Sequence, residues 1–297
     1  MKKNLLIIFI GLLSFHTSFS QRQPKSAASS LQDSLETIAK DARGTVGVSI
    51  LYKASGRRIS LHGKEHFPMQ SVYKFPLALK ILHDVDNGKL SLDQKIHIDQ
   101  KDWPLKIYSP LRDSLKGQAA NLSLRTLLQY TVSKSDNGGC DVLFKVTGGT
   151  RVVNDFIHHL GINDIAIVAT EAEMAKAWNI QYGNWCTPDA MTALLERFMD
   201  GEILKPASTK LLMQFMINTT TGPGRLKGML PSTTKVAHKT GSSDTNDKGI
   251  TAATNDAGII TLPDGNHLLI TVFVKDAAAD VSTRERVIAR IAAAAYK

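Results

Sequence analysis

The sequence predicts an α/β fold of the α+β kind: one antiparallel sheet flanked by terminal helices, with an inserted all-helical domain. Strand-like segments lie near both ends of the 297-residue chain, whereas the apolar spacing between them is mainly helical. The simplest packing joins the strands of both ends into one sheet beside the helical part. We therefore expect a sheet domain formed by residues 21–66 and 222–297, and a helical domain formed by residues 67–221.

The N-terminal elements follow from local patterns. Leu31, Leu35 and Ile38 lie on one helical stripe and predict a helix over residues 30–42. Strands are predicted over residues 45–52 and 58–61, on either side of a turn signal that ends at Gly56. The middle of the chain then has helical spacing over a series of segments: 71–83, 123–133, 137–146, 150–160, 188–200 and 207–217.

The β pattern returns towards the C-terminus. Strands are predicted over residues 249–261 and 267–274. Between them, Pro263-Asp264-Gly265-Asn266 is typical of a hairpin connection. Residues 282–296 then form an apolar-faced helix, which completes the expected flank of the sheet.

The N-terminus has the pattern of a secretory signal peptide, residues 1–20. Lys2 and Lys3 precede the apolar run from Leu5 to Leu13, and small residues lead to a cleavage site near Ser20-Gln21. The apolar run is shorter than the roughly 20 residues of a membrane span. We therefore expect a periplasmic protein that has no membrane attachment after cleavage.

Composition and charge restrict the partners. The formal charge of +9 is dispersed without a dense basic tract, so we expect no nucleic acid partner and favour anionic small substrates. The nine histidines lack metal-ligand spacing, so we expect no metal site. We also expect no cofactor, and a monomer. Cys140 follows two glycines in an apolar stretch, which favours a buried free thiol. Whether it pairs with Cys186 is left open, because spacing cannot establish disulfide geometry.

Three short motifs carry the chemistry. In chain order they are Ser71-Val72-Tyr73-Lys74, Ser135-Asp136-Asn137 and Lys239-Thr240-Gly241. Together they provide a hydroxyl nucleophile, amines that can activate it, a second hydroxyl that can relay a proton, and a cation for an anionic substrate. Their occurrence together and in this order points to acyl transfer more strongly than any one of them.

A Ser-x-x-Lys motif alone is weak evidence, since a second copy runs from Ser232 to Lys235. That copy lies in a polar stretch with no apolar periodic run behind it. After Ser71, in contrast, apolar residues continue at helical spacing and predict a buried helix that starts near the serine. Lys74 would lie beside the Ser71 hydroxyl, because residues three apart on a helix are neighbours.

With these motifs the chain resembles the class A serine β-lactamases, in particular the extended-spectrum subgroup that contains the PER, VEB and Bacteroides-type cephalosporinases. The resemblance implies hydrolysis of the β-lactam ring of antibiotics, with cephalosporins favoured and penicillins also accepted, and so antibiotic resistance. Further strings extend it along the chain: Phe67-Pro68-Met69-Gln70, Tyr108-Ser109-Pro110, Thr170-Glu171-Ala172-Glu173-Met174, Thr221-Gly222-Pro223-Gly224-Arg225, Thr251-Ala252-Ala253-Thr254-Asn255-Asp256 and Val272-Phe273-Val274-Lys275-Asp276.

The resemblance implies a role for each residue of the reaction. Ser71 attacks the lactam carbonyl, and the backbone N–H groups of Ser71 and Ser242 form the oxyanion hole. Either Lys74, or Glu171 through a water, accepts the serine proton. Ser135 passes a proton to the departing lactam nitrogen.

The resemblance also implies the residues that bind the substrate. Asn137 holds the acyl-amide side chain and Tyr108 forms a wall. Arg225 supplies the charge of an arginine that many members carry near the position of Thr254. The substrate-binding set is Tyr108, Asn137, Arg225, Lys239, Thr240, Gly241 and Ser242.

Glu171 separates the possible activities. A penicillin-binding protein also forms an acyl-enzyme but stalls, whereas a β-lactamase needs a base to activate water. The resemblance favours Glu171 over the nearby Glu173 as that base. The alternatives are a D,D-peptidase or penicillin-binding protein, and a β-lactam sensor that stays acylated. Another kind of serine hydrolase is disfavoured because Ser71 lacks a Gly-x-Ser-x-Gly motif.

The loop around Glu171 departs from the pattern of the wider family. Ala175 occupies the position where many class A enzymes have an asparagine that helps to hold the hydrolytic water. Ala169 and Asn184 replace an arginine–aspartate pair that commonly ties this loop. We expect a different loop conformation, which opens the pocket to bulky cephalosporin side chains.

Overall fold

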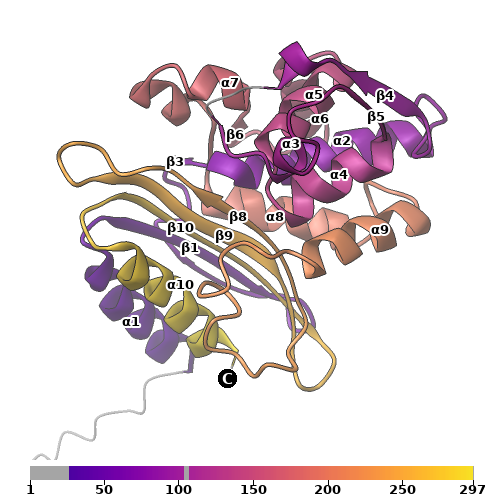
Figure 1. Cartoon of the computed structure of the whole chain (residues 1–297). Helices are drawn as coiled ribbons and strands as arrows, with labels where there is room; N and C mark the ends of the chain where they lie inside the picture. Colours follow the sequence, from indigo (N-terminus) through magenta and orange to yellow (C-terminus); the bar gives the residue numbers. More distant parts are fainter. Residues whose placement is uncertain (1–26, 104–106, 297) are drawn as a thin grey trace, which may run out of the picture.

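The computed structural model describes residues 27–103 and 107–296, so the predicted signal peptide and its cleavage site lie outside the described residues. Its centre is a five-stranded antiparallel sheet with the strand order β2-β1-β10-β9-β8 (Figure 1). The strands are β1 (Thr45–Tyr52), β2 (Arg57–Leu61), β8 (Val236–Ser242), β9 (Thr251–Thr261) and β10 (His267–Ala277). Both ends of the chain therefore contribute to one sheet, as predicted.

Two helices cover one face of this sheet. They are α1 (Ala27–Ala39), which continues into the 3-10 turn η1 (Lys40–Ala42), and α10 (Val281–Ala295) (Figure 1). Leu35 of α1 and Ile288 of α10 are fully buried in one apolar cluster with the sheet residues Ile50 and Ile270. Removing this apolar surface from water is the main force that holds the layer together.

The remaining long helices pack on one another in the helical part of the molecule, which meets the other face of the sheet mainly through its last two helices. They are α2 (Lys74–Asp86), α4 (Leu124–Ser133), α5 (Asn137–Thr147), α6 (Thr150–His159), α8 (Pro188–Met199) and α9 (Pro206–Ile217). Helix α2 is the most deeply buried of these, with Leu77, Ala78 and Leu79 fully inaccessible. Helix α8 lies on the sheet, where the Thr192 hydroxyl is 2.9 Å from the Thr271 hydroxyl on β10. The predicted fold class, a sheet with terminal helices and a helical middle, is confirmed.

Several short elements were not predicted as such from the sequence. They are β3 (Phe67–Pro68), β6 (Ile165–Ala166) and β7 (Trp185–Cys186) in a small sheet, β4 (Lys95–Ile98) and β5 (Ala120–Ser123) in a hairpin, the helices α3 (Pro110–Ser114) and α7 (Glu171–Met174), and the 3-10 turns η2 (Gln70–Tyr73), η3 (Gln100–Asp102) and η4 (Trp178–Gly183). Segments of two to six residues are too short to show a period.

Three strand boundaries differ from the predictions: β2 begins one residue earlier, at Arg57, β10 extends three residues further, to Ala277, and β9 begins two residues later. Strand β9 begins at Thr251 and not at residue 249, because Gly249 has a φ of +73° within a turn. The Asn246 side chain stabilises that turn by accepting the backbone N–H groups of Lys248 and Ile250, both at 3.0 Å. An asparagine side chain that bonds nearby backbone in this way is typical of a turn.

Cys140 and Cys186 are both buried and free, so the question of their pairing is answered in favour of two thiols. Burial raises the pKa of each thiol well above its usual value. Within residues 27–103 and 107–296, no helix combines the length and apolar character that crossing a membrane requires.

Candidate active site

Ser71 lies in the 3-10 turn η2 and not in an α-helix. This turn ends at Tyr73, and α2 begins at the next residue, Lys74. Gln70 precedes Ser71 with a φ of +48°, a left-handed conformation that is uncommon for a residue other than glycine. Lys74 begins α2, and its Nζ donates to Ser71 Oγ at 2.8 Å. The predicted proximity of the serine and the lysine is therefore present, on a strained turn.

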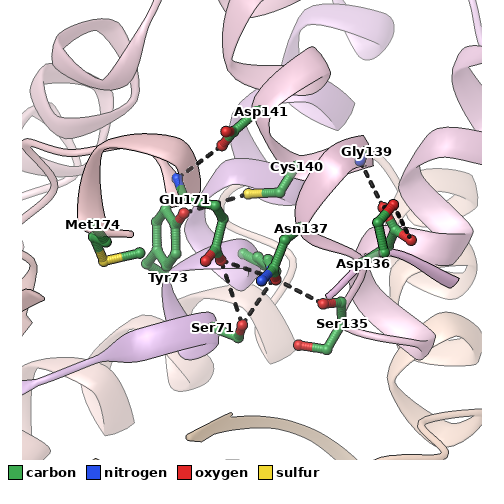
Figure 2. Close-up of polar contacts among 12 residues, drawn as sticks. Ser71, Tyr73, Ser135, Asp136, Asn137, Gly139, Cys140, Asp141, Glu171 and Met174 are labelled. Carbon is green, nitrogen blue, oxygen red and sulfur yellow. Dashed lines mark hydrogen bonds and ion pairs between the residues drawn. The ribbon is translucent and has the colours of Figure 1, made fainter. Parts of the chain in front are cut away.

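Lys74 is fully buried and surrounded by acceptors. Its Nζ lies 2.9 Å from Glu171 Oε1 and donates to the Ser135 carbonyl at 2.9 Å, as well as to Ser71 and the Asn137 side-chain oxygen. A buried charge is tolerated only when it is paired and hydrogen-bonded. Lys74 thus ties two other chain segments, 135–137 and the one that carries Glu171, to Ser71. Figure 2 shows Ser71, Asn137 and Glu171 converging on one point.

Ser135 lies between two lysines. Its carbonyl accepts from Lys74, and its hydroxyl oxygen accepts from Lys239 Nζ at 2.8 Å. Lys239 also donates to the Thr240 carbonyl at 2.9 Å. Burial and the nearby charge of Lys74 hold the pKa of Lys239 well below its usual range. The Ser135 hydroxyl is therefore in contact with an amine that releases a proton more readily than an exposed lysine.

Asp136 builds the corner that carries Ser135 and Asn137. Its fully buried carboxylate accepts the backbone N–H of Leu111 and of Gly139, both at 2.7 Å, and the Ser109 hydroxyl at 3.0 Å; Figure 2 shows the bond from Gly139. The first of these bonds joins the segment that follows Tyr108 to the start of α5. The middle residue of the Ser-Asp-Asn motif therefore has a structural task.

The sheet closely approaches the turn that carries Ser71 at Gly241. A Cβ atom there would lie 2.4 Å from the Met69 carbonyl oxygen, which excludes any side chain. Asn255 on β9 secures the contact, because its Nδ2 donates to the carbonyls of Pro68 at 2.7 Å and Met69 at 3.1 Å. The strand that carries Lys-Thr-Gly is thus held directly against the turn that carries Ser71.

Glu171 is the first residue of α7 and is almost completely buried. Its Oε1 lies 3.5 Å from Ser71 Oγ. The Asp141 carboxylate accepts the backbone N–H groups of Glu171 at 2.8 Å and Ala172 at 2.9 Å, and burial raises the pKa of Asp141 to about 6. Glu173, in contrast, is used in a capping box with Thr170. Of these two glutamates, Glu171 is the one in contact with Ser71 and Lys74.

Asn184 holds the loop at the position where the arginine–aspartate pair is missing. This fully buried side chain accepts the backbone N–H groups of Val168 at 2.8 Å and Ala169 at 2.9 Å. It also donates to the Ala169 carbonyl at 2.7 Å. One amide therefore replaces the ion pair, because it supplies both an acceptor and a donor to the backbone.

Arg225 lies behind the strand end. Its guanidinium donates to the carbonyls of Gly241 at 3.0 Å and Asn255 at 2.9 Å, and to the Ser242 hydroxyl at 2.6 Å. Its Nε is paired with Glu285 of α10 at 3.1 Å. Arg225 is buried, so its charge reaches the site through Ser242.

A cleft of about 680 Å³ opens over these groups. It contains the predicted residues Ser71, Tyr108, Asn137, Glu171 and Ser242, with Tyr108 as an exposed aromatic wall. The other predicted residues are buried and are not among the residues that line the cleft: Lys74, Ser135, Arg225, Lys239, Thr240 and Gly241. The cleft is completed by Gln70, Ile107, Met174, Ala175, Lys176, Ala177, Trp178, Gln181, Ser243 and Asp244.

The fold and the two serine–lysine contacts define a serine acyl-transfer enzyme, of the type shared by β-lactamases and penicillin-binding proteins. A model of the Beta-lactamase enzyme family matches residues 30–297, and the chain belongs to this family. The chain is therefore a serine β-lactamase. The predicted resemblance to the class A enzymes is confirmed.

Individual relatives agree with this. The chain is 41% identical to the extended-spectrum beta-lactamase PER-1 of Pseudomonas aeruginosa over 280 residues, which cover 94% of this chain and 91% of that one. It is 41% identical to beta-lactamase VEB-1 of the same species over 292 residues, covering 98% and 95%. The crystal structure of a beta-lactamase from Chitinophaga pinensis matches with a TM-score of 0.88 and 51% identity, covering 90% of this chain and 98% of that one.

Two further residues hold the site together and are not indicated by the motifs, Asp141 and Asn255. Asp141 lies four residues after Asn137 on α5, so helical spacing places both side chains on one face. The position of Asp141 near the site could therefore have been predicted from the sequence. Asn255 contacts Pro68, just before Ser71, across 187 positions of the sequence, and no local pattern indicates such a contact.

Proposed function

We propose that this chain hydrolyses the β-lactam ring of antibiotics through an acyl-enzyme on Ser71, and that Glu171 activates the water that releases the acyl group. The observation that carries the proposal is the position of Glu171 Oε1, which is 3.5 Å from Ser71 Oγ and 2.9 Å from Lys74 Nζ. The acyl-enzyme ester forms on Ser71 Oγ, so a single water molecule can bridge the Glu171 carboxylate and the ester carbonyl carbon. A general base for deacylation requires this arrangement.

The acylation step uses the Lys74–Glu171 pair. Ser71 Oγ attacks the lactam carbonyl as its proton passes either to Lys74 or, through a water, to Glu171, both of which lie within 3.5 Å of that oxygen. The backbone N–H groups of Ser71 and Ser242 are proposed to receive the oxyanion, and both residues line the cleft. The negative charge of the tetrahedral intermediate also develops close to the buried lysine.

The departing nitrogen needs a proton, and Ser135 is proposed to supply it. Its hydroxyl contacts Lys239 at 2.8 Å, and its backbone carbonyl accepts from Lys74. Because the pKa of Lys239 is well below its usual range, this lysine can return a proton to Ser135 without a large penalty. The C–N bond of the lactam then breaks with the nitrogen leaving as a neutral amine.

Substrate binding is proposed to involve the two ends of the cleft. Ser242, with Arg225 behind it, and Thr240 bind the carboxylate of the substrate, and Lys239 and Gly241 belong to the same strand. The remaining groups orient the acyl side chain: the Asn137 amide binds it, and the exposed ring of Tyr108 packs against it.

A preference for cephalosporins follows from the lining near the loop. Ala175 and Ala177 both line the cleft, and each has only a methyl group as its side chain. They leave room for a bulky acyl substituent, while Met174 and Trp178 provide apolar contact for it. We therefore place cephalosporins above penicillins, and both above carbapenems.

We also infer that the mature chain acts as a periplasmic monomer, with the sheet domain and the helical domain (67–221) on either side of the cleft. The support is the signal-peptide pattern before Gln21, together with a site made from one chain. The mass of the exported protein tests the cleavage site, and light scattering tests the monomer.

Turnover assays test the activity. We expect many turnovers with nitrocefin, a penicillin and an oxyimino-cephalosporin, and slower turnover with a carbapenem. Hydrolysis of a D-alanyl-D-alanine peptide without β-lactam turnover would indicate a D,D-peptidase. Acylation of one equivalent of each β-lactam with no release would indicate a sensor, and either result would contradict the proposal.

A further inference from the structure

A buried histidine–aspartate pair lies next to the strand end that faces the cleft. His238 on β8 has its Nδ1 2.9 Å from both carboxylate oxygens of Asp256 on β9, and both side chains are completely buried. The other ring nitrogen, Nε2, has no hydrogen-bond partner among the described residues. A buried unpaired polar atom reduces stability, so packing alone gives no reason for a histidine here.

Asp256 has a second hydrogen bond that leads out of the pair. Its Oδ2 accepts the backbone N–H of Leu226 at 3.2 Å. Leu226 is fully buried in the apolar cluster under the sheet and directly follows Arg225. The carboxylate therefore attaches the backbone that carries Arg225 to the middle of the sheet, and His238 orients that carboxylate.

Arg225 passes this attachment on to the cleft. Its guanidinium donates to the Gly241 carbonyl at 3.0 Å and to the Ser242 hydroxyl at 2.6 Å. Of these residues, Ser242 lines the cleft. A chain of contacts thus runs from His238 through Asp256, the 225–226 backbone and the arginine side chain to a hydroxyl that faces the substrate.

We propose that the His238–Asp256 pair is a positioning element, which holds Arg225 under Ser242 and thereby sets how well the site binds the substrate carboxylate. This inference rests on the proposed function, because the carboxylate is that of a β-lactam. Asp256 has a further, electrostatic effect: its negative charge raises the pKa of Lys239 against the effect of burial. Both effects act on the same end of the cleft.

The test compares a substrate with and without its carboxylate. Benzylpenicillin and its methyl ester differ in this group alone, so the ratio of their kcat/KM values measures how the site uses the charge. In His238→Leu, which keeps a similar volume but removes the donor, we expect kcat/KM for the free acid to fall about tenfold. For the ester the fall should be less than about threefold, since it lacks the charge.

Two matched variants separate positioning from folding. His238→Asn places an amide donor near the position of Nδ1 and should restore most of the acid-to-ester ratio. Thr192→Val removes the buried 2.9 Å contact with Thr271 between α8 and β10. It should lower the unfolding temperature and leave the ratio unchanged. If the leucine variant does not fold, His238→Ala repeats the measurement with a smaller side chain.

The outcomes are distinct. A folded His238 variant with an unchanged ratio, or with equal losses for acid and ester, would overturn the positioning role. A wild-type chain that turns over neither compound would contradict the proposed function itself. Wild-type turnover combined with an unchanged His238 variant would contradict this inference alone.

Discussion

Replacing Asp141 with asparagine is expected to change how stability depends on pH. The Asp141 carboxylate accepts the backbone N–H groups of Glu171 and Ala172. Burial raises its pKa from 3.8 to about 6, with a smaller increase from the charge of Glu171 and an opposing effect from Lys74. The group that holds the turn of Glu171 therefore titrates within the range in which the enzyme can be assayed.

The sign and size of the effect follow from this shift. Because the folded-state pKa lies above the unfolded one, the contribution of Asp141 to stability is fully present below the unfolded pKa. It is lost as the pH rises through about 6. A shift of about two units corresponds to about 3 kcal/mol, of which about 2 kcal/mol is developed by about pH 4. Asparagine does not titrate, so the wild type should gain this amount over Asp141→Asn between about pH 7 and pH 4.

Urea unfolding of both proteins at several pH values measures this difference. Deacylation should change in the opposite sense, since a protonated Asp141 loses one of its two acceptor positions and the turn of Glu171 loosens. The wild type should therefore lose deacylation rate more steeply than Asp141→Asn as the pH falls. Asp155→Asn, at an exposed helical ion pair, is the control and should show neither change. A stability difference that is the same at every pH would refute the reasoning.

Three further outcomes are expected. Gly241→Ala would place a Cβ 2.4 Å from the Met69 carbonyl oxygen and push β8 away from the turn of Ser71. Acylation by nitrocefin, measured by stopped flow, should therefore slow about 100-fold. A wild-type rate would contradict the close approach. Asn184→Ala leaves backbone groups of the loop unpaired, so the free energy of unfolding in urea should fall by about 2–4 kcal/mol. The acyl-enzyme should also live longer. A fall in the free energy of unfolding below about 0.5 kcal/mol would argue against this role. Cys140 and Cys186 are buried and free, so a thiol reagent should react with neither in the native protein and with both in denaturant; modification of the native protein would contradict their burial.

The long elements could be predicted because they bury one regular face. Helix α8 (Pro188–Met199) and strand β1 (Thr45–Tyr52) agree with their predicted ranges to within one residue. Boundaries were predicted less well where the local backbone departs from the pattern. The first predicted helix changes to a 3-10 turn at Lys40, and the turn of Ser71 precedes the α-helix that the apolar spacing indicates.

The site shows the same division between local and distant information. Ser71 and Lys74 lie three residues apart, so their contact follows from helical spacing. Asn255 is far from Pro68 in the sequence, and only the folded sheet brings them together. The resemblance suggests Arg225 as a cation for the substrate carboxylate, which remains a prediction. Its burial behind Ser242 could not be predicted, because it depends on the packing of α10 and β9.

The central claim is that Glu171 releases the acyl group from Ser71, and intact-mass spectrometry of Glu171→Ala tests it most directly. With a cephalosporin, this variant should accumulate a covalent adduct on Ser71 that persists, while the wild type under the same conditions shows the free enzyme and hydrolysed product. Glu173→Ala is the matched control, since Glu173 serves in the cap of α7, and it should turn over. Rapid turnover by Glu171→Ala, with no adduct, would contradict the account.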